Sequence, residues 1–290
     1  MCTSRLKSVQ IEVGKHRRSC MRRAFFALLF TTFKEIRRQP SVWIVTIAGV
    51  ILTLALPTLS VYAIGQEKNL LFSLGISTFE LGGLIIALFG ALKTLSAEIE
   101  NSTILGLLSK PVSRTNLILG KFSGVALAVF AFHLIIAVTL VFSFYFWHSI
   151  QGPYGTTVYR NDGFWGVFAL EAPYIFKAAY LLFLQNIILT SAIISGSVFL
   201  PVVGNTIFGV ILFFIGHLND WFDYIFSDTL IIPTIVNILP DFQIFDINGF
   251  FRGKIPVPFS FMVAGTVAGL LYTIIFLLPG IWILNRRDFN

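Results

Sequence analysis

Several stretches of this chain run for more than twenty residues without Lys, Arg, Asp or Glu. The clearest cover residues 39–66, 122–159 and 260–285. A helix needs about 20 mostly apolar residues to cross roughly 30 Å of hydrocarbon, so each run is long enough for a membrane span. The composition, 56% hydrophobic and 12% charged residues, excludes an ordinary soluble domain. The chain is therefore predicted to be an all-α integral membrane protein.

The number of spans follows from two further stretches. The uncharged run 178–219 is 42 residues long and has Pro201 and Gly204 near its middle, which favours two spans joined by a tight turn. Residues 69–92 are apolar apart from Glu80, and their length also suits a span. The sequence thus predicts six transmembrane helices, at about 42–64, 70–92, 122–147, 178–200, 202–218 and 260–284.

The basic residues predict how these helices are oriented. With the N-terminus inside, 16 of the 21 Lys and Arg residues lie on the cytoplasmic side, as expected when positive charge is retained there. We therefore expect both termini in the cytoplasm, with the chain in a bacterial inner (plasma) membrane. The net charge of +7 then reflects topology. Nucleic-acid binding is the weaker alternative, and no nucleic-acid partner is predicted.

The N-terminal region divides into a leader and an amphipathic segment. Residues 1–21 form a basic cytoplasmic leader, which is predicted to be disordered. Residues 22–38 place Phe25, Leu29 and Phe33 at helical spacing, with charged side chains mostly opposite. This pattern predicts a helix lying in the cytoplasmic headgroup region. The alternative is a basic flank that only directs insertion.

The two long segments on the predicted outer side contain apolar pieces that are too short to span. Residues 148–176 mix glycines with aromatics, and residues 221–258 include the apolar stretch 230–239, interrupted by proline. Such pieces can form short helices that lie at the interface or re-enter the membrane. We expect short helices at the outer mouth, and we treat residues 22–290 as one transmembrane domain.

Polar residues inside the predicted spans are candidate functional groups. A charged group in hydrocarbon costs on the order of 3 kcal/mol, so Glu80 should face other helices, a cavity or the outer interface. Glu80 is therefore a candidate pathway residue. The polar side chains of His133, Gln185, Asn186 and Asn205 are interpreted as interhelical hydrogen-bonding groups, the commoner use of such residues.

Membrane-enzyme chemistry has little support in the sequence. Ser195 and Ser197 with His217 are the nearest approach to a serine and its base, but they fall on two predicted spans without an oxyanion-loop pattern. No His pair spaced i, i+4 with Glu and no Asp cluster suggests a metal site. A lipid-modifying enzyme is thus the least favoured class.

The chain also lacks a nucleotide-binding loop of its own. The Gly120-Lys121 pair superficially resembles the end of a phosphate-binding loop, but Phe122 follows where Ser or Thr would bind magnesium. No cofactor is predicted in this chain, and it should not hydrolyse ATP itself.

The densest polar insertion between two spans is residues 98–121. Ser102 or Asn101 can cap a short helix with an apolar side that includes Leu107 and Leu108, and Pro111 ends it. A cytoplasmic helix of this kind can dock in a groove on a soluble partner. The alternative is a solvated connector at the interface.

This segment resembles the corresponding loop of the ABC-2-type permease family. The similar residues are an acidic pair, a Thr, a leucine pair, Pro-x-x-Arg and Gly-Lys, namely Glu98, Glu100, Thr103, Leu107, Leu108, Pro111, Arg114, Gly120 and Lys121. Residues 33–40 and 286–289 are also similar to that family. One departure is Ser102, where the family commonly has Gly before the Thr.

The resemblance implies one permease half of an ATP-driven exporter, working as a homodimer or related heterodimer with a separate cytoplasmic ATPase that binds ATP-Mg. Residues 22–38 would be the elbow helix, residues 98–115 would contain the coupling helix, and the turn at 201–205 would make a smaller contact. The residues implied in ATPase docking or coupling are Glu98, Glu100, Thr103, Leu107, Leu108, Lys110, Pro111, Arg114 and Lys121. A non-transporting scaffold or assembly factor is the main alternative, and the resemblance does not select a cargo.

Overall fold

The computed structural model describes residues 23–60, 65–96, 114–151, 163–219, 225 and 239–286. Within these ranges every regular element is a helix, as the sequence predicted. The loop predicted to dock a partner falls mostly outside them, because residues 97–113 are not described, whereas its C-terminal part from Arg114 is.

Five helices are long and apolar enough to cross a membrane. They are α2 (Pro40–Ser60), α3 (Glu67–Ala91), α6 (Arg114–Gln151), α8 (Ala172–Gly196) and α13 (Phe259–Arg286). The helix α3 continues directly into a π-helical turn, η1 (Leu92–Ser96). These helices confirm an integral membrane protein with several spans.

The sixth apolar helix, α9 (Val202–His217), is shorter than a standard span. Its 16 residues correspond to about 24 Å at 1.5 Å per residue, less than the roughly 30 Å of a bilayer core. The turn into α9 is held by Asn205, whose Nδ2 donates to the Ile193 carbonyl at 2.8 Å and to the Ser197 hydroxyl at 2.9 Å. As the sequence indicated, Asn205 therefore joins two helices.

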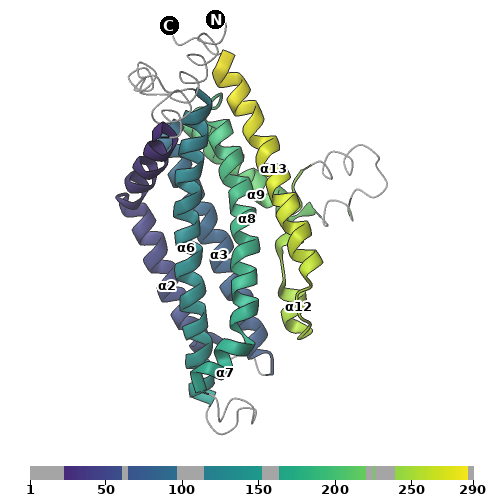
Figure 1. The fold of residues 1–290 in the computed structure, drawn as a ribbon. Helices are drawn as coiled ribbons and strands as arrows, with labels where there is room; N and C mark the ends of the chain where they lie inside the picture. The colour runs from purple at the N-terminus through teal and green to yellow at the C-terminus, as the bar shows by residue number, and fades with distance from the viewer. Residues whose placement is uncertain are drawn as a thin grey trace, which may run out of the picture.

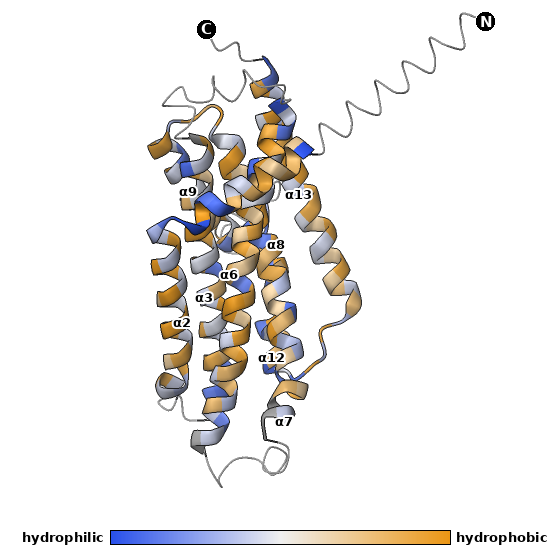
Figure 2. Cartoon of the chain, turned by 60° about the vertical axis from the view of Figure 1, so that its left-hand side comes forward, coloured by the Kyte–Doolittle hydropathy of each residue, from blue (hydrophilic) through white to orange (hydrophobic). Residues whose placement is uncertain are grey.

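The helix α8 lies at the centre of the bundle (Figure 1). It packs against α3, α6, α9 and α13, and most of its residues are buried. By contrast, few residues of α2 and α13 are buried. Figure 2 shows hydrophobic residues along much of both helices, as expected for surfaces that face lipid or another hydrophobic protein surface.

Residues 23–37 are helical and pack against the start of α6. The missing side chains of Gly120 and Gly124 permit this approach, because a Cβ atom would lie 2.7 Å from Leu28 Cβ at the first position and 2.6 Å from Thr32 Cβ at the second. Phe30 points away from the bundle and is 61% exposed. The helix therefore has one face on the protein and an aromatic side available to the membrane.

Short helices occupy part of the long connecting segments. The helix α7 (Gly163–Leu170) lies at the opposite end of the bundle from residues 23–37 (Figure 1). The 3-10 helix η3 (Phe242–Phe245) and the helix α12 (Asn248–Arg252) precede α13. The rings of Phe251 and Phe72 stack at 3.9 Å, which fixes α12 against α3. Most of the apolar stretch 230–239 lies outside the described residues.

Candidate functional site

Most of the residues predicted to dock a partner lie outside the described part of the chain. These are Glu98, Glu100, Thr103, Leu107, Leu108, Lys110 and Pro111. The two basic residues that complete the set, Arg114 and Lys121, are described, and both lie at the start of α6. The structure therefore reveals how the segment 97–113 is anchored at its ends.

Lys121 connects α6 to the end of α3. Its side chain is buried, with 3% exposure, and its ammonium donates to the backbone carbonyl of Thr94 in the π-helical turn. The Thr94 hydroxyl in turn donates to the Gly90 carbonyl at 2.6 Å. A buried ammonium needs acceptors, and carbonyls at the C-terminal end of a helix carry partial negative charge. Lys121 thus joins the elements on either side of the segment 97–113.

Arg114 makes a second connection, from α6 to the end of α13. Its guanidinium Nη1 donates to the Leu284 carbonyl at 2.8 Å and to the Asn285 carbonyl at 3.2 Å. These carbonyls belong to the last turn of α13, where a cation is favourable. Both predicted basic residues therefore donate hydrogen bonds within the chain.

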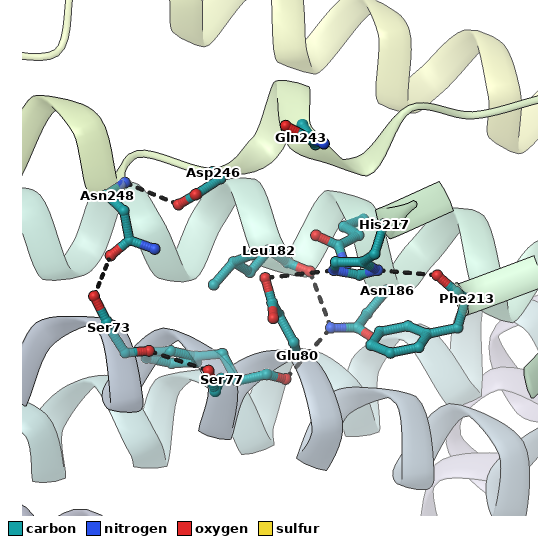
Figure 3. A network of polar contacts seen from close by, with 12 residues as sticks. Ser73, Ser77, Glu80, Leu182, Asn186, Phe213, His217, Gln243, Asp246 and Asn248 are labelled. Atoms are coloured by element: carbon teal, nitrogen blue, oxygen red, sulfur yellow. Dashed lines mark hydrogen bonds and ion pairs between the residues drawn. The ribbon is translucent and has the colours of Figure 1, made fainter. Parts of the chain in front are cut away.

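The candidate pathway residue Glu80 lies in the interior of α3 and contacts α9. Its Oε1 atom is 3.6 Å from Nε2 of His217, a pair that is ionic only when the histidine is protonated (Figure 3). The side chains are 18% exposed for Glu80 and 27% for His217, so neither is sealed inside the protein. Glu80 is therefore paired with His217, which lies 137 positions further along the chain.

Two serines extend from Glu80 along the same face of α3. Ser73, Ser77 and Glu80 are spaced i, i+4 and i+7, which places them on one side of a helix, and we call them the polar stripe. Ser73 donates to Oδ1 of Asn248 at 3.1 Å and accepts from Arg252 at 3.5 Å. The stripe is therefore contacted at one end by α12 (Figure 3).

A separate polar contact joins α3, α6 and α8 beside the stripe. Asn186 is fully buried, and its Nδ2 lies 3.1 Å from the Leu182 carbonyl, 3.5 Å from the Phe79 carbonyl and 3.4 Å from Nε2 of His133. Gly83 provides the space, because a Cβ atom there would lie 2.3 Å from this nitrogen. Asn186 and His133 thus act as interhelical groups, as interpreted from the sequence.

The residues considered for serine chemistry are not brought together. Ser197 accepts from Asn205 at the start of α9, whereas His217 is the last residue of that helix. Twelve residues separate Asn205 from His217, about 18 Å along a helix. The arrangement offers no serine and base within reach of each other.

Sequence reasoning missed several of these partners. It identified Glu80 as needing a partner but did not pair it with His217, and it did not anticipate the bond from Lys121 to Thr94. It also missed an ion pair at the far end of α3, where Lys68 Nζ lies 2.7 Å from Glu171 Oε1. The available signal was a single charged residue in an apolar run. Such a residue indicates that a partner exists, but not where in the chain that partner lies.

Together these features define a polytopic, all-helical membrane protein whose charged residues are used for contacts between helices. The model of the ABC-2 family transporter protein matches residues 26–289. The chain belongs to this family and is the membrane component of an ABC-2 type transporter. No curated protein sequence matches the chain.

The ABC-2 membrane family is a family of permease components that lack ATPase motifs. The family implies that a partner subunit hydrolyses ATP and associates with the membrane component.

Proposed function

We propose that the chain is the permease subunit of an exporter and that a cytoplasmic ATPase subunit docks on residues 98–115. The observation that carries this proposal is the anchoring of the segment 97–113 at both ends. Lys121 ties α6 to the turn that follows α3, and Arg114 ties α6 to the end of α13. A force applied to the segment would therefore act on three spans together.

The anchoring also suggests a division of labour among the predicted docking residues. Leu107 and Leu108 would contact the ATPase, with Glu98, Glu100, Thr103, Lys110 and Pro111 shaping the loop. Arg114 and Lys121, which already donate to carbonyls of this chain, would transmit motion between helices. Closure of two ATPase subunits on ATP-Mg would then drive a rigid-body change between inward-facing and outward-facing states.

The same proposal includes two copies of the permease. Glu80 is partly exposed, and Ser77, one turn away, is exposed as well. Direct contact of a carboxylate with lipid would cost on the order of 3 kcal/mol. We therefore place the polar stripe against a second copy, or a related permease, across a pathway that holds water or cargo.

In this arrangement the six helices cross the membrane with both termini in the cytoplasm. The helix α9 would count as the fifth span, and the described segment 239–258 would belong to the outer part of the protein. The helix formed by residues 23–37 would be the elbow helix, with Phe26 and Phe30 in the headgroup region, because these exposed rings suit that environment.

The docking proposal is tested by replacing Leu107 and Leu108 together by Asp in the full chain. The two charges should abolish co-purification of the ATPase subunit, since they would have to be buried in its groove. The matched control replaces Ser102 and Ser109 by Asp, which places two charges away from the apolar side of the same predicted helix. Membrane insertion should be retained in both variants.

Two results would contradict the proposal. Unchanged co-purification of the leucine variant would remove residues 98–115 from the docking surface. Isolation of the wild-type chain from its native membrane without any ATPase subunit would favour the non-transporting scaffold.

A further inference from the structure

The pair formed by Glu80 and His217 lacks a hydrogen-bond donor when the histidine is neutral. Nδ1 of His217 lies 2.9 Å from the Phe213 carbonyl, and because a carbonyl only accepts, this nitrogen carries a hydrogen. In the neutral ring Nε2 is then an acceptor, and the amide nitrogen of Gln185 donates to it at 3.3 Å. The Glu80 carboxylate, 3.6 Å from the same Nε2, faces a second acceptor.

A neighbouring side chain adds one more acceptor without a donor. Gln185 is fully buried, and its Oε1 atom has no hydrogen-bond partner. An unsatisfied buried polar group costs about 1–3 kcal/mol, so the polar cluster around His217 is incomplete within the chain.

From these contacts we infer that Glu80, His217 and Gln185 form a binding site for the protonated amine of an amphipathic organic cation. An ammonium supplies several donors and a positive charge, which the Glu80 carboxylate accepts, while the Gln185 amide nitrogen holds the neutral His217 ring beside it. The 3.6 Å separation of Glu80 from His217 is longer than the 2.7 Å ion pair of Lys68 with Glu171, so Glu80 is held weakly by its present partner.

The surroundings also suit an organic cation. Rings of Phe213 and Phe242 lie 4.3 Å and 5.4 Å from the His217 ring, which gives an apolar wall next to the charged group. A second carboxylate, Asp246, appears in the same network, and its Oδ1 accepts from the Asn248 backbone at 2.8 Å (Figure 3). The basic group that contacts the stripe is Arg252, at Ser73, which lies about 10 Å from Glu80 along α3. Carboxylates thus predominate around Glu80.

This inference rests on the proposed function, because it assigns a class of cargo to the pathway that the polar stripe would line. The experiment uses the full chain in lipid nanodiscs without an ATPase subunit. The probe is dansylcadaverine, which has a primary ammonium, and the comparison is its N-acetyl derivative, which keeps the dansyl body and lacks the charge. Binding is measured by fluorescence anisotropy after subtraction of empty nanodiscs.

We expect the amine to bind at least tenfold more tightly than the acetylated probe. Glu80→Gln should abolish this preference, Gln185→Met should reduce it several-fold, and Glu80→Asp should retain part of it. Glu171→Gln, which removes a carboxylate from the Lys68 ion pair, should keep it in full. Each variant must elute as a single species, and retention of part of the preference by Glu80→Asp shows that the site remains folded.

Equal binding of the two probes by the wild-type chain would overturn the inference, as would an undiminished preference in Glu80→Gln. Binding no greater than to empty nanodiscs would mean that water or a proton alone completes the cluster, and it would overturn the inference equally. Because no ATPase is present, these outcomes leave the docking proposal untouched. Loss of docking in the leucine variant would likewise leave amine binding unaffected.

Discussion

Replacing Arg114 by Gln should loosen the end of α13. The guanidinium donates to the carbonyls of Leu284 and Asn285. The glutamine side chain is shorter and uncharged, so it cannot replace these charge-assisted hydrogen bonds. Only the last turn of α13 depends directly on this contact, so the effect should be confined there.

The size of the effect follows from the geometry. Both bonds come from one nitrogen, at 2.8 and 3.2 Å, so they count as little more than one charge-assisted hydrogen bond. Such a bond contributes about 1.5–3 kcal/mol, and partial exposure of Arg114 favours the low end. A cation at a helix C-terminus adds about 0.3–1 kcal/mol. The total is about 2 kcal/mol, equivalent to roughly a 30-fold increase in local opening.

Hydrogen–deuterium exchange of the full chain in nanodiscs measures this opening. Amides of the last turn of α13 should exchange up to about 30-fold faster in Arg114→Gln, while amides in the middle of α13 should not change. Arg286→Gln is the matched control, because the Arg286 guanidinium stacks over the Trp282 ring at 4.1 Å at the same helix end. Unchanged exchange in the last turn of the Arg114 variant would show that the contact does not restrain α13.

Two further predictions concern other contacts at the candidate sites. Lys121→Met keeps most of the buried stem but removes the bond to Thr94, so the ATPase should still co-purify while its stimulation by the permease falls several-fold; full stimulation would refute a transmitting role. Gly83→Ala places a Cβ atom 2.3 Å from Asn186 Nδ2 and should lower stability by about 1–3 kcal/mol in a thermal unfolding assay. Gly249→Ala, where a Cβ would meet nothing within 4 Å, is the control, and equal melting temperatures for the two variants would contradict the packing argument.

The sequence predicted the fold class well because the hydrocarbon core imposes a length that can be counted in residues. Five uncharged or nearly uncharged runs correspond to helices that are long enough to cross a membrane. The run after Pro201 was equally apolar and stops before Asp220, and its helix ends at His217 after 16 residues. The pattern therefore indicated a helix here, although its 16 residues fall short of the usual length of a span.

Residue pairing was much harder to predict from the sequence than helix content. Lys121 lies in a polar segment and was interpreted as a docking or coupling residue, but the sequence did not indicate that it is 3% exposed and bonds to Thr94. Nothing local distinguishes a lysine that reaches a neighbouring helix end from one that reaches solvent. Glu80 was different, because a lone carboxylate in a span requires compensation, although the position of its partner depends on the tertiary packing.

The contacts of α9 explain how a small movement of the segment 97–113 could reach Glu80. Along α3, Glu80 and Thr94 are 14 residues apart, about 21 Å, so they belong to one nearly continuous helical rod. The helix α9 packs against η1 and, through His217, pairs with Glu80. Under the proposed mechanism, a pull on the segment 97–113 displaces α3 relative to α9. Because Glu80 and His217 are already 3.6 Å apart, a shift of about 1.5 Å, the rise of one helical residue, would separate them. Helix shifts of about 1–2 Å are typical of switching membrane and allosteric proteins, so ATP-driven closure need not deform the bundle to free Glu80 for a cargo amine.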